Sequence, residues 1–345
     1  MMPRGPGIPA KGRDAMDIAT DDVRTQLLDR RQRVESVMAV RPAPKYGDLL
    51  NEIDLALGRL DAGTYGICET CGDPIEPEGL MKDPLVRFCI DHLTPLQARE
   101  LERDLQLAAK VQLELLPPRQ LVEGDWQIAY HYEPRGAVSG DYCDVLQSSD
   151  EAGGLVFLLG DISGKGVAAS MLMAHLHASV RTLVGFGLPL HQIVERANRV
   201  FCDSTMANHY ATLVCGRLAR SGDAEICNAG HCAPLLVQGG RLAALQSTAV
   251  PIGLFCTNEY PVDRVHLAAG DSLVLYTDGV TETRNAAHEE YGPERLADLV
   301  AARAPDPPEA LVRACVDDLA RFRGGAPLDD DVTIMVIRRM APGPS

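Results

Sequence analysis

Four aspartate-bearing segments of this sequence are the ones best suited to chemistry. They are Ser139-Gly140-Asp141, the glycine-rich residues 160–166 with Asp161, Tyr276-Thr277-Asp278-Gly279, and Asp329-Asp330-Asp331. Each borders an apolar run, so its carboxylates emerge from a core, where an unpaired charge is costly. Converging carboxylates need cations, and oxygen-only ligands favour Mg²⁺ or Mn²⁺. Four of them suffice for a two-metal centre of the kind that hydrolyses phosphate esters.

Other interpretations of these segments are weaker. A single aspartate in such a turn is more often a cap or turn residue than a ligand, but four together reverse those odds. Residues 160–166 lack the G-x-x-x-x-G-K-[ST] spacing of a nucleotide-binding loop. Cys143 is not followed by an arginine-bearing phosphate loop, which argues against a thiol nucleophile. His231 lies in a turn between predicted strands, where a structural role is the better interpretation.

A second constellation combines three cysteines and a histidine. Cys68-x-x-Cys71 is followed, after an intervening stretch, by Cys89-x-x-His92. Two chelating pairs of thiolate and imidazole ligands predict one tetrahedral Zn²⁺ site. Because four protein ligands leave no open position, the predicted role of this zinc is structural.

Helices and strands of different kinds must position the two constellations. Residues 14–60 are predicted to be helical, with a break at 41–44, and their apolar periodicity includes Val23, Leu27, Val34 and Val37. Residues 61–93 have too little apolar content for a core of their own, which favours a metal as their organiser. Thr94 to Leu116 is predicted to be a helix with a capping box at its start. Its near-heptad Leu101, Leu105, Ala108 and Leu115 are consistent either with pairing in a homodimer or with packing on its own domain.

The remaining chain predicts a larger α+β domain. Strands are expected from Trp126 onward, at 210–218, 224–229, 272–277 and 332–338, with helices at 165–185 and 190–206 and a last helix pair before the closing strand. Consecutive strands in this order indicate antiparallel sheets with helices outside. The predicted domains are therefore 1–93, a connecting helix 94–117, and 118–340.

Composition excludes several classes of protein. The net charge of −15 would repel nucleic acid and anionic membranes, so neither is an expected partner. The sequence has no run of about 18 apolar residues and no apolar stretch in residues 1–13. The other seven cysteines are scattered singly, which indicates a reducing compartment with one metal site. We therefore expect a cytoplasmic protein.

The chain resembles the SpoIIE-like branch of the metal-dependent PPM protein phosphatases over residues 99–339. The segments that carry this resemblance are residues 107–112 and 115–117, Tyr132-Glu133-Pro134, Gly140-Asp141-Tyr142-Cys143-Asp144, the Asp161 loop, Asn228-Ala229-Gly230-His231, Gly253-Leu254, Gly270-Asp271, residues 276–282 and Asp330-Asp331-Val332-Thr333. The resemblance implies an αββα sandwich, two antiparallel sheets with flanking helices.

The resemblance also implies roles for individual residues. Asp161 would bridge two Mn²⁺ or Mg²⁺ ions, the carbonyl of Ile162 and Asp141 would serve one ion, and Asp278 and Asp330 the other. Asp331 would support these ligands. Ser163 stands where eukaryotic relatives have a histidine, so the general acid has no assigned residue, and Arg135 is shifted by one position from its usual place in this branch.

Residues 14–93 are similar to the DksA/TraR zinc-finger family. The similarity rests on Gly63 to Cys68, Cys71-Gly72, Ile75, Pro84, Cys89 and the preceding helix. His92 replaces the family's usual fourth cysteine. Family members bind RNA polymerase through a helical hairpin with a D-x-x-D-x-A motif at its tip, and Asp14-Ala15-Met16-Asp17-Ile18-Ala19 matches that pattern. Acidic residues favoured at a helix N-terminus explain these positions at least as well.

Together these features predict a phosphatase acting on phosphoserine or phosphothreonine of a protein. The family resemblance implies an anti-sigma-factor antagonist of the STAS type as the substrate, with the zinc domain as a regulator. The alternative is a transcription regulator that binds RNA polymerase and has an appended phosphatase. A zinc module that mainly dimerises the chain is a third hypothesis.

Overall fold

The computed structural model describes residues 13–40, 44–89, 92, 95–148, 154–205 and 209–341. The chain divides into two compact units, Met1–Glu102 and Arg103–Ser345, which are described separately here. The division falls inside α4 (Pro95–Leu115), between the domain limits predicted at residues 93 and 117.

The first unit contains an antiparallel helical hairpin. Helix α1 (Arg13–Val40) and helix α2 (Pro44–Asp61) are separated at the predicted break. Their opposite directions follow from two ion pairs, Arg24 with Asp61 at 2.7 Å and Arg31 with Asp54 at 2.8 Å. The hairpin core consists of Leu27, Ile53, Ala56 and Leu60. Val37 is exposed, because the apolar contacts of α1 reach only to Val34.

A compact loop region follows the hairpin and contains the short helix α3 (Pro77–Lys82). Its small core consists of Cys68, Ile75 and Cys89, with Leu80, Val86 and Phe88 packed around them. The hydroxyl of Tyr65 donates a hydrogen bond of 3.0 Å to the carbonyl of Pro84. So small an apolar core agrees with the expectation that a metal organises this segment.

The second unit contains two antiparallel sheets. The six-stranded sheet has the order β1-β2-β11-β10-β7-β8 and the five-stranded sheet has the order β3-β4-β5-β6-β9. The strands are β1 (Gln120–Glu123), β2 (Trp126–Glu133), β3 (Asp141–Gln147), β4 (Gly154–Ile162), β5 (Ala211–Ala219), β6 (Asp223–Ala229), β7 (Leu235–Gln238), β8 (Arg241–Ala244), β9 (Asp263–His266), β10 (Ser272–Tyr276) and β11 (Val332–Arg339).

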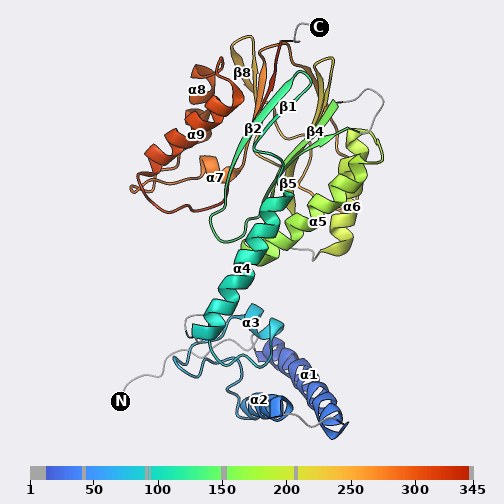
Figure 1. The fold of residues 1–345 in the computed structure, drawn as a ribbon, viewed down its shortest axis with the longest axis vertical. Coiled ribbons are helices and arrows are strands. Elements are labelled where there is room, and N and C mark those ends of the chain that lie inside the picture. The colour runs from blue at the N-terminus through green and yellow to red at the C-terminus, as the bar shows by residue number, and fades with distance from the viewer. Residues whose placement is uncertain are drawn as a thin grey trace. The chain divides into compact units, whose positions relative to one another are not determined.

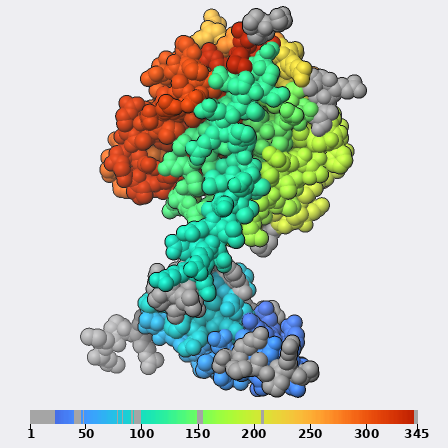
Figure 2. All heavy atoms as spheres, viewed as in Figure 1, coloured from blue at the N-terminus to red at the C-terminus, as the bar shows by residue number. Residues whose placement is uncertain are grey.

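The two sheets pack face to face between two layers of helices. Side chains of both sheets, such as Phe157 of β4 and Leu275 of β10, share one core. A second core lies between the five-stranded sheet and helices α5 (Gly166–Val184) and α6 (Leu190–Ser204). A third lies between the six-stranded sheet and helices α8 (Pro293–Ala302) and α9 (Pro308–Arg323). Figure 1 shows the two helix pairs on opposite sides of the strands, and Figure 2 shows them as the yellow-green and red flanks of this unit. The predicted αββα sandwich is confirmed.

Helix α5 is the one helix among the described residues whose length and composition would allow it to cross a membrane. Its buried residues, including Met173, Leu176 and Val180, belong to the core beneath the five-stranded sheet. Helix α5 therefore packs on the sheet through one face, and a helix of a globular domain can meet the same criterion.

Candidate active site

The predicted aspartates gather where two pairs of neighbouring strands end. Asp141 begins β3 and is the register partner of Asp161 near the end of the antiparallel β4. In the other sheet β10 ends just before Asp278, and the antiparallel β11 begins just after Asp330. Because an antiparallel pair brings the end of one strand beside the start of the next, each pair presents its acidic residues at one edge.

Two threonine hydroxyls connect the edges of the two sheets. Thr277 donates a hydrogen bond of 2.9 Å to Asp141 Oδ2, and the hydroxyl of Thr333 donates to the same oxygen. The backbone N–H of Thr333 donates to Thr277 Oγ1 at 3.0 Å. Both threonines stand within the acidic motifs of the sequence, but no role was predicted for either of them.

Gly279 allows the two acidic segments of the six-stranded sheet to approach closely. A Cβ added at this glycine would lie 1.9 Å from the carbonyl oxygen of Asp331, which no side chain could tolerate. A milder restriction holds at Gly140, whose Cβ would lie 3.1 Å from the Ile162 carbonyl oxygen and 3.3 Å from Asp161 Oδ1, contacts that a small shift could relieve. Glycine at both positions therefore lets the backbone pack against the acidic residues.

The clustered carboxylates raise one another's pKa. Burial, followed by the charges of Asp278 and Asp330, raises the pKa of Asp161 to about 7. Burial and the neighbouring Asp330 also raise the pKa of Asp278. Burial first, and then Asp161, holds the pKa of Asp141 well above its usual range. When these carboxyls ionise, their negative charges lie close together with little compensation, and oxygen donors of this kind fit divalent cations.

One ammonium group and one open cavity lie beside the cluster. Lys165 Nζ forms an ion pair of 2.7 Å with Asp330 and also donates to the carbonyl of Asp329 at 3.0 Å. A cavity of about 300 Å³ opens here, and its lining includes Arg135, Lys165 and Asp330. The site thus has a cavity lined by apolar residues and by two cationic side chains, next to its carboxylates.

Asp331 differs from the other aspartates because both of its oxygens bind backbone groups. Oδ1 accepts a hydrogen bond of 2.7 Å from the N–H of Arg135, and Oδ2 accepts one of 2.9 Å from the N–H of Gly140. Asp331 therefore holds the segment that leads into β3.

Three residues near the cluster have structural surroundings. Cys143 is fully buried, and burial raises the pKa of its thiol well above the usual value, which is unsuited to a nucleophile. Burial lowers the pKa of His231 to about 4, and its Nδ1 lies 2.8 Å from the hydroxyl of Thr212. The hydroxyl of Ser163 accepts a hydrogen bond of 2.9 Å from the N–H of Tyr210.

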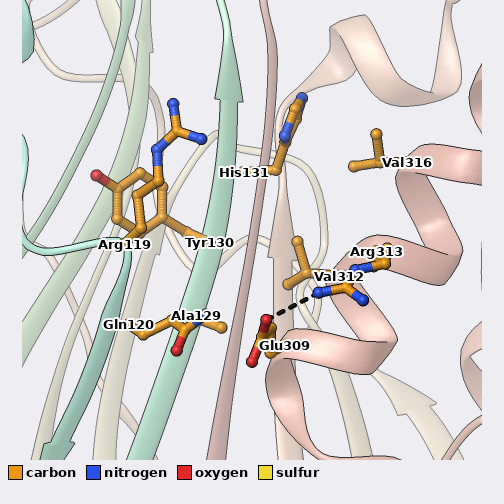
Figure 3. Close-up of a pocket in the computed structure, with 9 residues that line it drawn as sticks. All are labelled: Arg119, Gln120, Ala129, Tyr130, His131, Glu309, Val312, Arg313 and Val316. Carbon is orange, nitrogen blue, oxygen red and sulfur yellow. Dashed lines mark hydrogen bonds and ion pairs between the residues drawn. The ribbon is translucent and has the colours of Figure 1, made fainter.

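Another cavity, of about 210 Å³, lies between β2 and α9 on the outer face of the six-stranded sheet (Figure 3). Its lining includes the 2.8 Å ion pair between Glu309 and Arg313, with Arg119 and His131 nearby. None of the predicted site residues lies in it. Of the four aspartates predicted as metal ligands, Asp330 lines the cavity of about 300 Å³ described above.

The four predicted zinc ligands come together in the first unit. The ligand atoms of Cys68, Cys71, Cys89 and His92 all lie within 4.8 Å of one another. The sulfurs of Cys71 and Cys89 are 3.8 Å apart, which matches the edge of about 3.8 Å expected for a tetrahedron with Zn–S bonds of about 2.3 Å. Burial opposes ionisation of Cys68, yet backbone N–H groups of Cys71 and Cys89 lower the pKa of its thiol to about 6. The donor set fits one structural Zn²⁺.

The acidic pattern at residues 14–19 lies far from the turn of the hairpin. It occupies the first turns of α1, whereas α1 and α2 are connected after Val40. The side chains of Asp14 and Asp17 are outside the described residues. The backbone alone shows that the pattern is at the opposite end of the hairpin from the tip position that the DksA/TraR resemblance implies.

Comparison with known proteins agrees with this architecture. The family described as stage II sporulation protein E (SpoIIE) matches residues 151–340, more than half of the chain. The chain belongs to the SpoIIE family. The match lies entirely within its second unit.

Individual relatives of this SpoIIE-family protein extend the match. Protein IcfG of Synechocystis is 26% identical over 82% of this chain and 49% of its own length, so the chain spans about half of that relative. Phosphoserine phosphatase RsbU of Bacillus subtilis is 24% identical over 70% of this chain and 71% of its own. The SiaA-PP2C domain of Pseudomonas aeruginosa has the same fold, with a TM-score of 0.62 and 20% identity over 71% of this chain and 99% of that domain.

The zinc segment of the SpoIIE-family protein has its own match. The family described as prokaryotic dksA/traR C4-type zinc finger matches residues 63–91. The match ends just before His92, the position at which this chain departs from a four-cysteine set. The predicted zinc finger of this type is confirmed.

Proposed function

We propose that this protein hydrolyses phosphoserine or phosphothreonine on a protein substrate, with two Mn²⁺ or Mg²⁺ ions as cofactors. The observation that carries the proposal is the convergence of Asp141, Asp161, Asp278 and Asp330 at neighbouring strand ends, where burial first, and then the charges of Asp278 and Asp330, raise the pKa of Asp161 to about 7. Such a cluster is stable in its ionised form only with bound cations. When bound, the ions supply the Lewis acidity that activates water for attack on a phosphate ester.

The chain's own residues divide this work. Asp161 would bridge the two ions, with Asp141 and the Ile162 carbonyl serving one ion, and Asp278 and Asp330 the other. The threonine hydroxyls on Asp141 support this arrangement because they leave one carboxylate oxygen, Oδ1, free of these two donors. The cavity beside Asp330, with Arg135 and Lys165 in its lining, would admit the phosphorylated residue.

The proposed substrate is an anti-sigma-factor antagonist of the STAS type. Support comes from membership in the SpoIIE family and from the similarity to phosphoserine phosphatase RsbU. The protein would act in the cytoplasm, and the zinc domain would regulate the phosphatase or tether it to its place of action.

A phosphate-release assay tests the proposal. Full-length protein is incubated with phosphorylated antagonist proteins of the STAS type, with Mn²⁺ or Mg²⁺ present and after chelation. We expect release that requires the divalent ion and resumes when it is restored. Absence of metal-dependent release from every phosphoprotein and from p-nitrophenyl phosphate would reject the proposal.

The zinc-finger match supports a second candidate function, binding to RNA polymerase through residues 14–93. The location of the acidic pattern at the start of α1, away from the hairpin turn, weakens this alternative. Pull-down of purified RNA polymerase by the full-length protein, compared with protein lacking residues 1–93, decides between them.

A further inference from the structure

Helix α4 forms part of the candidate active site. Leu105 lines the cavity beside Asp330, and Gln112, two turns later on the same face, is buried with 6% of its surface exposed. A buried polar side chain on an otherwise apolar helix face requires partners, since an unsatisfied amide costs about 1–3 kcal/mol.

Both hydrogen-bond partners of the Gln112 amide belong to Ser139, in the segment that precedes β3. Its Nε2 donates to the carbonyl of Ser139 at 2.7 Å, and its Oε1 accepts from the N–H of Ser139 at 3.0 Å. A side-chain amide paired with a single backbone residue in both directions reproduces the bonding of a neighbouring strand. These two hydrogen bonds also fix the orientation of the Gln112 amide, with Oε1 toward the N–H and Nε2 toward the carbonyl of Ser139.

Ser139 in turn is hydrogen-bonded to Asp141. The hydroxyl of Ser139, which is fully buried, accepts a hydrogen bond of 3.0 Å from the N–H of Asp141. Between these residues, the N–H of Gly140 donates to Asp331. Residues 134–140 lie outside the named strands, and of their backbone groups only the carbonyl of Gly140 bonds to a strand among the described residues, accepting from the N–H of Ile162 in β4 at 3.3 Å. Gln112 binds both backbone groups of Ser139, and Asp331 binds the N–H of Gly140.

We propose that Gln112 is a positioning residue for the proposed phosphatase reaction, which holds Asp141 and the cavity wall at residues 135–138 through its two-way bond to Ser139. This inference rests on the proposed function. Residues bonded directly to metal ligands typically affect metal affinity or activity by about 10–100-fold when they are changed, and Gln112 acts one residue further away, so the lower end of this range applies.

Isosteric variants of the full-length, zinc-loaded protein test the role. Gln112→Met removes both hydrogen bonds at nearly constant volume, and Gln112→Glu keeps only the acceptor for the Ser139 N–H. The exposed Lys110→Met on the same helix is the matched control. Mn²⁺ affinity is measured by calorimetry, hydrolysis of p-nitrophenyl phosphate by initial rates, and folding by circular dichroism and thermal melting.

We expect Gln112→Met to bind Mn²⁺ about 10-fold more weakly and to lose a similar factor in kcat. Gln112→Glu places a carboxylate oxygen against the Ser139 carbonyl and should lose at least as much, and Lys110→Met should match wild type. Ser139→Ala should reproduce part of the loss, and adding it to Gln112→Met should cost less than the sum of the two, because both changes interrupt one chain of contacts.

The outcomes distinguish failure of the Gln112 role from failure of the proposed function. Folded Gln112→Met with wild-type Mn²⁺ affinity and kcat overturns the inference and leaves Gln112 a packing residue. If Gln112→Met does not fold, Gln112→Glu and Ser139→Ala decide by the same two measurements, and wild-type values for both overturn it. A wild-type protein that neither binds Mn²⁺ nor hydrolyses any phosphate ester rejects the proposed function itself.

Discussion

Asp141 and Thr277 are joined by a hydrogen bond of 2.9 Å across 136 positions of the chain. Asp141 begins β3 of the five-stranded sheet, and Thr277 directly follows β10 of the six-stranded sheet. The bond therefore ties the two sheets together beside the acidic cluster, and it ends on a carboxylate with 1% of its surface exposed.

Thr277→Val should destabilise the protein and weaken the metal centre. The variant keeps the side-chain shape but leaves Asp141 with one donor fewer, which costs about 1–3 kcal/mol for a buried polar group. Urea unfolding and Mn²⁺ calorimetry measure both effects. Thr182→Val, at an exposed position of α5 whose hydroxyl bonds within the helix, is the control. Unchanged unfolding free energy in Thr277→Val would show that the bond between the sheets contributes nothing.

Asp278→Asn should abolish metal-dependent hydrolysis while leaving the fold intact. The change removes a proposed ligand and also relieves part of the repulsion that raises the pKa of Asp161. We expect a loss of about 100-fold or more, larger than for residues that only orient ligands. The exposed Asp329→Asn next to Asp330 provides the control and should retain activity. Phosphate release and circular dichroism check both variants, and near-wild-type turnover of Asp278→Asn would contradict the two-metal assignment.

The stability of metal-depleted protein should depend on pH through Asp161. Its folded pKa of about 7 lies above the ordinary value of 3.8, so the folded state holds this proton more tightly than the unfolded state. The resulting stabilisation is complete below about pH 4 and is lost as the pH rises to about 7. Asp161→Asn should therefore exceed wild type in unfolding free energy at pH 7.5 and approach it at pH 4. Equal differences at both pH values would show that Asp161 does not titrate in this range.

Cys68→Ser should remove zinc from the first unit. A structural zinc site can contribute on the order of 10 kcal/mol to local folding, so residues 63–92 should lose amide protection while the aspartates of the second unit remain in place. Elemental analysis should fall from about one zinc per chain to none, and hydrogen exchange should report the loss of order. The control is Cys256→Ser, which changes an exposed cysteine of the second unit, and this variant should retain about one zinc per chain.

Deletion of residues 1–93 complements that substitution. Because the second unit has its own three cores, we expect a folded phosphatase that retains some metal-dependent activity. If rate, metal dependence and mass by light scattering all equal those of the full-length protein, the zinc domain does not regulate the enzyme. The polymerase-binding alternative would then explain its presence better.

The sequence by itself determined the features that depend on local spacing. The motifs Cys68-x-x-Cys71 and Cys89-x-x-His92 imply zinc because two ligands separated by two residues can bind the same ion. Asp161 and Asp278 could be placed at strand ends because each follows an apolar run long enough to form a buried strand. The heptad face of α4 left two interpretations open, and in the second unit Leu105, Gln112 and Leu115 of that face contact their own domain.

Only the tertiary structure decided how those residues are held. The roles of Thr277, Thr333 and Gln112 could not be predicted from their sequence neighbours, since their partners lie elsewhere in the chain and meet them only through sheet register and helix packing. Gln112 did leave a faint signal, a polar residue on the apolar face of α4. The acidic pattern at residues 14–19 shows the opposite case, because its match in sequence could not reveal that α1 places it at the far end of the hairpin. Spacing along a chain constrains neighbours within a turn or a strand, whereas the contacts that orient a site depend on how distant segments pack.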